Sequence, residues 1–182
     1  QENIKAMAES KSPESFPAMI YEFGQQGQSA ALLKEWAASL AERRSIPNAR
    51  GAFIRAAEVD PSDPEPHFFL GLIRMNTGDF SGAIASFEQA VARSPEMGEA
   101  RSNLGTLYLQ AGETQRAVDN LNRALALGSD SSGLRNNLAV IHAKGGRMEE
   151  AIREANLALV LDPDNRVARE NLINFRRLLE KK

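Results

Sequence analysis

The sequence predicts an all-α fold built from tandem antiparallel helix pairs. Equivalent residues recur every 34 positions, as from Gly71 to Gly105 and from Ala83 to Ala117. Between these positions the apolar side chains stand three or four residues apart, which is the spacing of one face of a helix. A fixed period of this length is typical of a repeat array, because a single helix pair cannot bury its apolar face and neighbouring pairs must stack.

Three copies of the repeated pattern are well formed, and they resemble the tetratricopeptide repeat (TPR). Each copy carries a Leu-Gly or Leu-Ala pair, then a glycine turn, then spaced small and large apolar residues. The first copy has Leu70-Gly71, Gly78-Asp79-Phe80, Ala83, Phe87, Ala90 and Pro95, the second has Leu104-Gly105, Gly112, Ala117, Leu121 and Ala124, and the third has Leu138-Ala139, Gly146, Ala151, Ala155, Ala158 and Pro163. The resemblance implies a right-handed α-solenoid, the TPR superhelix, with a C-terminal capping helix.

The 34-residue frame divides the chain into six segments. The segment before Pro64 matches less well, because Arg44-Ser45-Ile46-Pro47 replaces the glycine turn. The last segment begins a further copy and stops after one charged helix, which suits a solenoid end that must cover its last apolar face. We expect an N-terminal segment with one helix at 1–29, a degenerate repeat at 30–63, repeats at 64–97, 98–131 and 132–165, and a capping helix at 166–182.

Two kinds of position are expected to shape each helix pair. Small residues let the paired helices approach closely, and they stand at Gly71, Gly105 and Ala139. A glycine in the left-handed region turns the chain from the first helix into the second, at Gly78, Gly112 and Gly146.

Composition excludes several classes of function. The formal net charge of -2 gives no electrostatic reason to bind nucleic acid, and no apolar run approaches the roughly 20 residues that span a bilayer. Cysteine is absent, so disulfides and thiolate metal sites are excluded. We therefore expect a soluble protein without nucleic-acid partners or direct membrane insertion. Its compartment stays open, either cytoplasmic or exported with a signal already removed.

Catalytic signatures are also missing. The sequence has no Gly-x-Ser-x-Gly, Walker or His-Glu-x-x-His motif. Its two histidines, His67 and His142, occupy repeat positions that the resemblance assigns to aromatic packing residues, and they lie two repeats apart. We expect no catalytic residue, no cofactor and no metal site, and hence not an enzyme.

The resemblance implies that the first helix of each repeat lines a concave groove, where we expect a partner peptide or helix to bind. Asparagines recur 34 residues apart at Asn103, Asn137 and Asn171. An amide offers donors and an acceptor, so this asparagine ladder suits the backbone of an extended peptide. The other reading is that the amides only satisfy neighbouring backbone groups. The expected wall consists of the ladder with Asn136, Thr106 and Val140.

A second candidate surface is the apolar stripe formed by Phe68, Leu72 and Met75, which stand four and three residues apart. Exposed apolar stripes often mark binding surfaces, and methionine and phenylalanine suit adaptable pockets. Alternatively, the degenerate repeat or the leading helix covers the stripe internally.

Two further patterns narrow the choice of partner. The dicarboxylate clamp of chaperone-binding TPR domains requires lysine and arginine residues, yet only Asn103 matches its pattern, so an acidic C-terminal tail is disfavoured. Arginines recur at Arg101, Arg135 and Arg169, where we favour stems packed on the preceding helix or paired with an acid over an anion site.

The sequence thus predicts a non-catalytic interaction scaffold or adaptor that holds a peptide or helix in its groove. Two alternatives remain. The array can instead self-assemble as a homo-oligomer, or it can be the regulatory part of a larger enzyme or complex.

Overall fold

The computed structural model describes residues 30–42 and 45–181. The helix expected within 1–29 lies outside these residues. In the described part all regular structure is helical, and the helices are α3 (Ala30–Glu42), α4 (Ile46–Val59), α5 (Glu65–Asn76), α6 (Phe80–Arg93), α7 (Gly98–Gln110), α8 (Thr114–Ala126), α9 (Ser132–Lys144), α10 (Met148–Leu161) and α11 (Arg166–Leu179).

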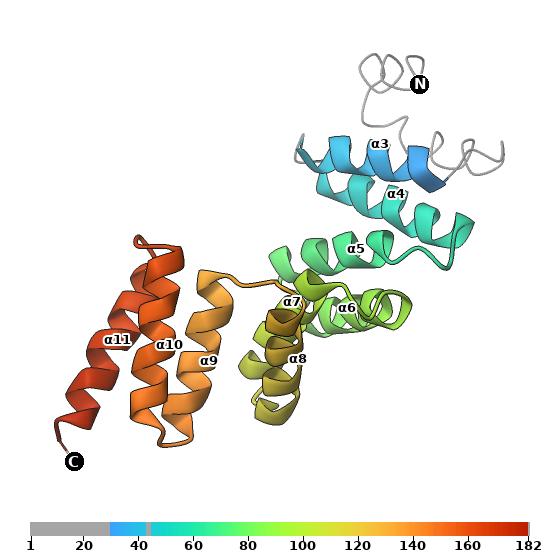
Figure 1. The fold of residues 1–182 in the computed structure, drawn as a ribbon. Helices are drawn as coiled ribbons and strands as arrows, with labels where there is room; N and C mark the ends of the chain where they lie inside the picture. The colour runs from blue at the N-terminus through green and yellow to red at the C-terminus, as the bar shows by residue number, and fades with distance from the viewer. Residues whose placement is uncertain (1–29, 43–44, 182) are drawn as a thin grey trace. The chain divides into compact units, whose positions relative to one another are not determined.

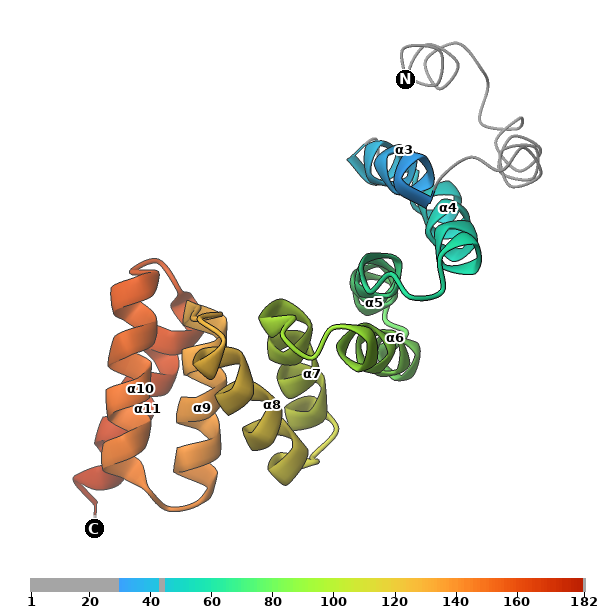
Figure 2. The same cartoon turned by 45° about the vertical axis from the view of Figure 1, so that its right-hand side comes forward.

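The chain divides into two compact units, one ending at Pro95 and one beginning at Glu96. In the first unit α3 pairs with α4 and α5 with α6, and α4 packs on α5 (Figure 1). In the second unit α7 pairs with α8 and α9 with α10, while α11 packs against α10 and α9; the last three helices lie side by side in both views (Figure 2). The predicted class, an all-α solenoid type of fold with tandem helix pairs, is confirmed.

Glycine turns join the helices of three pairs in the predicted way. Gly78 and Gly112 both have φ of 81°, and Gly146 has φ of 75°. In each turn the amide of the residue after the glycine donates to a carbonyl oxygen of the last helical turn, as Glu113 N does to the Tyr108 carbonyl oxygen at 2.8 Å. This bond caps an otherwise unpaired carbonyl and reverses the chain within two residues.

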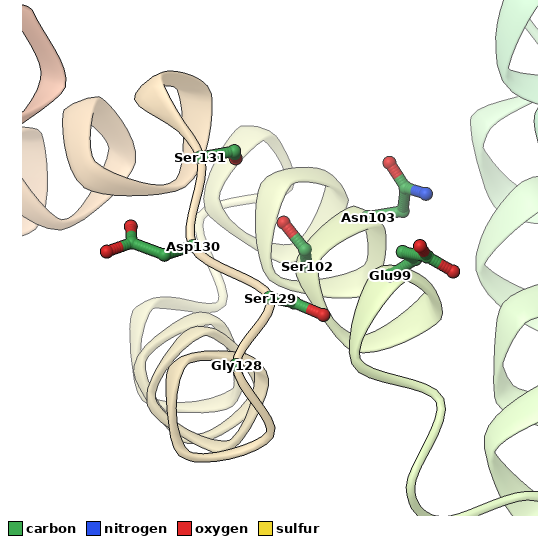
Figure 3. A pocket seen from close by; sticks show the side chains of 7 residues that line it. All are labelled: Glu99, Ser102, Asn103, Gly128, Ser129, Asp130 and Ser131. Atoms are coloured by element: carbon green, nitrogen blue, oxygen red, sulfur yellow. The ribbon is translucent and has the colours of Figure 1, made fainter. Parts of the chain in front are cut away.

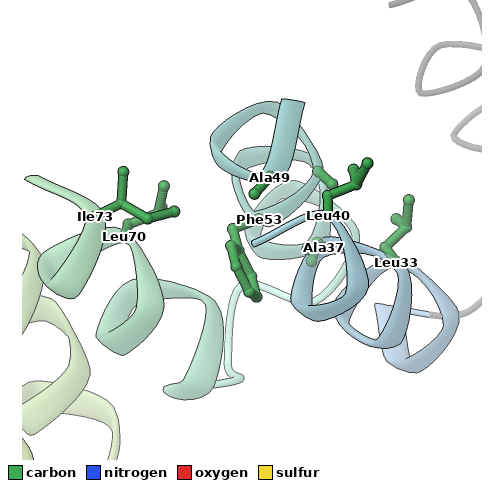
Figure 4. Packing of buried hydrophobic residues seen from close by; sticks show 9 residues of the cluster. Leu33, Ala37, Leu40, Ala49, Phe53, Leu70 and Ile73 are labelled. Atoms are coloured by element: carbon green, nitrogen blue, oxygen red, sulfur yellow. The ribbon is translucent and has the colours of Figure 1, made fainter. Parts of the chain in front are cut away.

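The core of the first unit is continuous from α3 to α5. Phe53 of α4 is 1% exposed, and its ring stacks on that of Phe69 of α5 with a centroid distance of 4.9 Å. Figure 4 shows the cluster around Phe53, which consists of Leu33, Ala37, Leu40, Ala49, Ala52, Phe53, Ala56, Leu70 and Ile73. Since these side chains come from three helices, the segment with the degenerate turn still shares one apolar core with α5.

The sizes of two facing residues are matched to each other in each well-formed pair. A Cβ on Gly71 would stand 2.6 Å from the Phe87 ring, and a Cβ on Gly105 would stand 2.5 Å from Leu121 Cγ. In the third pair both equivalent residues are alanines, Ala139 and Ala155, and both are fully buried. A large residue on the second helix therefore goes with glycine on the first, whereas a small one leaves room for a methyl group.

The second unit ends on α11, which contributes Leu172 and Phe175 to a core shared with α9 and α10. Its outer side carries exposed arginines together with an apolar residue, Ile173, which is 52% exposed. Ile173 stands 34 residues after Ala139, so it occupies the position that is glycine or alanine in the other repeats.

Candidate functional site

The first helices of the second unit bring the predicted polar wall together. Asn103, Asn137 and Asn171 lie on α7, α9 and α11, and α9 contacts both of the other two helices. Asn136, Thr106 and Val140 belong to the same helices, and all six side chains except that of Asn136 are partly exposed. The six polar-wall residues thus lie within one unit, while Phe68, Leu72 and Met75 all lie on α5 in the other.

Asn137 is held by its neighbour on α7. Its Nδ2 donates to Thr106 Oγ1 at 2.8 Å, and the Thr106 hydroxyl donates to the Ser102 carbonyl oxygen at 3.0 Å. Within the described part of the chain no group donates to Asn137 Oδ1. The bond therefore fixes the amide plane and leaves its carbonyl available as an acceptor.

Asn171 is held in a different way. The residue equivalent to Thr106 in the next repeat is Val140, which has no hydroxyl group. Asn171 Nδ2 donates instead to Oδ1 of Asn136, at 2.8 Å. Asn136 is only 8% exposed, so its amide supports Asn171 from below the surface. Part of the hydrogen-bonding capacity of the ladder is therefore used within the protein.

Asn103 lines a pocket of about 440 Å³ at the start of α7. Figure 3 shows that its wall comes from two segments, the first turns of α7 and the loop between α8 and α9. The lining residues are Glu99, Ser102, Asn103, Gly128, Ser129, Asp130 and Ser131, and we call this hollow the Asn103 pocket.

The loop that closes the Asn103 pocket departs from the repeat pattern. Ser129 stands where the flanking repeats have Pro95 and Pro163. Gly128 has φ of 82°, and Ser129 N bonds to the Ala124 carbonyl oxygen at 2.9 Å, so α8 ends in a glycine cap. The sequence analysis did not predict that this loop lines a pocket. The available signal was Gly128, a glycine directly after a predicted helix.

Arg135 anchors the same loop from the other side. Its guanidinium donates two bonds to the Asp130 carboxylate, at 2.8 and 2.7 Å, and a third to Glu154 Oε2 at 3.0 Å. The hydrogen bonds that Arg135 donates to Asp130 first, and then to Glu154, raise its pKa, while burial opposes them. For Arg135 the expected pairing with nearby acids is confirmed. Arg169 donates to the carbonyl oxygen of Pro163.

The apolar stripe on α5 is partly covered by its own unit. The Phe68 ring meets Phe69 edge-on with centroids 5.5 Å apart, and meets Phe87 at 5.8 Å. Leu72 and Met75 are also only partly buried. Phe68 therefore serves the packing of the α5–α6 pair and still presents part of its surface.

His67 lines a second pocket, of about 380 Å³, within the first unit. Its Nε2 is buried without a hydrogen-bond partner among the described residues. Burial lowers the pKa of His67, the positive charges of Arg93 and Arg74 lower it further, and Asp63 opposes them. The other residues that line the pocket are apolar and polar in equal number: Ile54, Ala57, Leu70 and Ala85, and Glu58, Arg74, Ser86 and Gln89.

This environment predicts an acid-sensitive fold. Between the lowered pKa of folded His67 and the ordinary value of 6.5, the unfolded chain binds more protons at this residue, so the free energy of unfolding falls as the pH drops below about 6.5. We expect His67→Phe to lose less stability than the parent between pH 7.5 and pH 5, in urea unfolding followed by circular dichroism. Equal losses in the two proteins would contradict this role of His67.

Other chemistry finds little support in the described residues. His142 Nδ1 accepts a bond from Arg147 Nε at 3.1 Å. In residues 30–42 and 45–181 no three histidine, aspartate or glutamate side chains gather in the way a metal site needs. None of the described helices combines the length and apolar character needed to span a bilayer.

Several solved structures share this fold. YrrB, a TPR protein with an unusual peptide-binding site, has a TM-score of 0.74 and 22% identity, over 94% of this chain and 87% of YrrB. MamA has a TM-score of 0.72 and 22% identity, over 83% and 82% of the two chains. The APC/C hetero-tetramer Cut9–Hcn1 has a TM-score of 0.69 and 17% identity, over 88% of this chain and 35% of the other. At sequence identities this low, the similarity to these structures shows a shared fold.

Comparison of sequences identifies the family. No curated protein sequence matches the chain significantly. The family model for the tetratricopeptide repeat, however, matches three overlapping stretches, residues 34–98, 70–132 and 102–166. These stretches contain the helix pairs, the glycine turns and most of the polar wall described above. The chain therefore belongs to the tetratricopeptide repeat family.

Proposed function

We propose that this chain is a non-catalytic interaction scaffold that holds an extended peptide or a helix of a partner protein on the first helices of its repeats. The family supports an interaction role, because its repeats generally serve as protein-binding modules. The observation that carries the proposal is the pre-oriented asparagine ladder of the second unit. Asn137 and Asn171 are each fixed by a 2.8 Å bond through Nδ2, while each amide oxygen accepts no bond from the described residues.

Such amides suit the main chain of a peptide. A backbone N–H needs an acceptor, and an amide oxygen held in place can provide it without a further loss of rotamer entropy. Because main-chain groups are the same in every residue, this grip does not depend on peptide sequence. Thr106 and Asn136 are then supporting residues: Thr106 orients Asn137 and Asn136 orients Asn171, and the ladder asparagines make the main contacts with the partner.

Apolar contacts are proposed beside the ladder in the second unit and, as a separate surface, in the first unit. Phe68, Leu72 and Met75 expose part of their surface on α5 of the first unit, and Val140 does so on α9 of the second. Side chains of this type offer adaptable surfaces for apolar residues of a partner. They are proposed as secondary contacts, since Phe68 is also engaged with Phe69 and Phe87.

The proposal is tested by peptide display on the full chain. Peptides selected on the parent protein should bind the Asn103→Ala/Asn137→Ala/Asn171→Ala variant about a hundredfold more weakly, since three hydrogen bonds of about 1 kcal/mol each are lost. The matched control is Asn122→Ala, an exposed asparagine on α8 outside the wall. If the triple variant keeps its circular dichroism spectrum and binds as tightly as the parent, the ladder does not hold the peptide.

A second candidate is self-assembly, and one observation favours it. Large apolar side chains are exposed on the last two helices, among them Val160 at 76% and Ile173 at 52%. Exposed apolar side chains of this kind can pair with a second copy of the chain. Light scattering over a range of concentrations separates the two candidates, because only self-assembly makes the measured mass grow.

A further inference from the structure

The Asn103 pocket is rich in hydrogen-bond acceptors. Glu99 contributes a carboxylate, Asn103 an amide oxygen, and Ser102, Ser129 and Ser131 contribute hydroxyl oxygens. No lysine or arginine is among the residues that line the pocket, and no large apolar side chain is either. The carboxylate can only accept, whereas the hydroxyls and the amide can accept or donate, so a cationic group that brings donors matches this lining better than an anion or an apolar group.

The charges around the pocket are unbalanced toward the negative. Arg135 is the cation nearest in the bonding network, and it is shared by Asp130 and Glu154. In Figure 3 the Asp130 side chain points away from Glu99 and Asn103. Glu99 is exposed, and its carboxylate has no hydrogen-bond or ion-pair partner in the described part of the chain. Two carboxylates thus share one guanidinium, while the Glu99 carboxylate has no cation paired with it among the described residues.

We propose that the Asn103 pocket receives a basic side chain, arginine or lysine, of the bound peptide. This inference rests on the proposed function and adds the chemistry of the partner: a peptide whose main chain lies along the ladder and whose basic residue enters the pocket beside Asn103. An ammonium group carries three donors and a guanidinium five, and neither accepts. The Glu99 carboxylate pairs with the positive charge, and the Asn103 amide oxygen and the Ser102 and Ser129 hydroxyls take the remaining donors, since Ser131 Oγ already accepts from Leu134 N.

The shape of the pocket depends on Gly98. A Cβ at this position would lie 2.1 Å from Ser129 Oγ and 2.9 Å from Ser129 Cβ, so the absence of a side chain lets the loop approach the start of α7. Gly98→Ala must therefore turn the Ser129 hydroxyl away and displace its Cβ, which alters this wall of the pocket. Gly133 is the matched control, because it also stands in the first turn of a first helix and a Cβ there would meet open space.

The test uses the isotope-labelled full chain and small probes in nuclear magnetic resonance titrations. Nα-acetyl-arginine methylamide and Nα-acetyl-lysine methylamide are expected to shift the amide signals of Glu99, Ser102, Asn103 and Ser129 in a saturable way, whereas Nα-acetyl-glutamate methylamide leaves them unchanged. Glu99→Gln should weaken the basic probes roughly two- to fivefold, as expected for an exposed charge pair. Glu170→Gln, an exposed acid on α11, should not.

The shape variants give a second measurement. Gly98→Ala is expected to weaken the arginine probe as well, while Gly133→Ala should bind it like the parent. Shifts that are absent, that are equal for the acidic probe, or that persist unchanged in Glu99→Gln would overturn the proposal.

Failure of this inference can be told apart from failure of the proposed function. The probes carry no peptide strand, so they report on the pocket whether or not the asparagine ladder binds a main chain. If displayed peptides require Asn137 and Asn171 but lack basic residues and ignore Glu99→Gln, the pocket proposal is wrong and the scaffold function stands. If the basic probes bind the pocket but no displayed peptide depends on the ladder, the pocket does receive a basic group and the ladder does not hold a main chain.

Discussion

Replacing Phe87 by alanine is expected to lower the free energy of unfolding by about 3–5 kcal/mol. Phe87 is fully buried, its ring lies against the Cα of Gly71, and it contacts the Phe68 ring. Truncation removes this apolar contact and leaves a cavity that the glycine opposite cannot fill. Urea unfolding of the full chain, followed by far-UV circular dichroism, measures the change.

The matched control is Phe80→Ala, seven residues earlier on the same helix. Phe80 is 52% exposed, so its truncation should cost about 1 kcal/mol or less. If the two variants lose similar stability, the close packing of the α5–α6 pair does not contribute what the structure indicates. The binding surface proposed on α5 depends on this result, since the Phe68 ring packs against Phe87.

The second large effect concerns the size match between Gly105 and Leu121. A Cβ on Gly105 would lie 2.5 and 2.6 Å from two Leu121 side-chain carbons and 3.2 Å from the Ala117 carbonyl oxygen. We expect Gly105→Ala to destabilise the second unit by about 1–3 kcal/mol through overpacking. Leu121→Ala alone should cost about 2–5 kcal/mol, because it empties a fully buried site.

The double variant Gly105→Ala/Leu121→Ala should cost less than the sum of the two single changes. It recreates the alanine pair that the next repeat has at Ala139 and Ala155, so the added methyl group occupies space that leucine vacated. We expect a coupling of about 1–2 kcal/mol in a double-mutant cycle measured by urea unfolding. Strict additivity would show that the two residues do not compete for the same volume.

Much of the fold could be predicted from spacing alone. The 34-residue period gives the helix pairs, and glycine at a fixed place in the frame gives the turns, since a positive φ is costly for any residue with a Cβ. The periods of three and four residues also place Asn103, Asn137 and Asn171 on one face of their helices. The placement of the ladder on α7, α9 and α11 was therefore within reach of the sequence.

The hydrogen-bond partners of those asparagines could not be predicted from the sequence. Asn137 bonds to Thr106 and Asn171 bonds to Asn136, although the two asparagines are equivalent in the repeat. The difference comes from a single neighbour on the adjacent helix, where valine replaces threonine. Helical spacing fixes the face of a side chain, but the partner it reaches depends on how two helices are packed.

The sequence by itself determined that this chain is a tandem array of helix pairs and which residues lie on the first helix of each. Only the tertiary structure decided which amides are fixed and which stay available, and that the loop from Gly128 to Ser131 meets the start of α7 to form the Asn103 pocket. The physical reason is range. Backbone geometry repeats locally along the chain, whereas a pocket needs side-chain volumes from residues far apart in sequence to leave a gap of the right size.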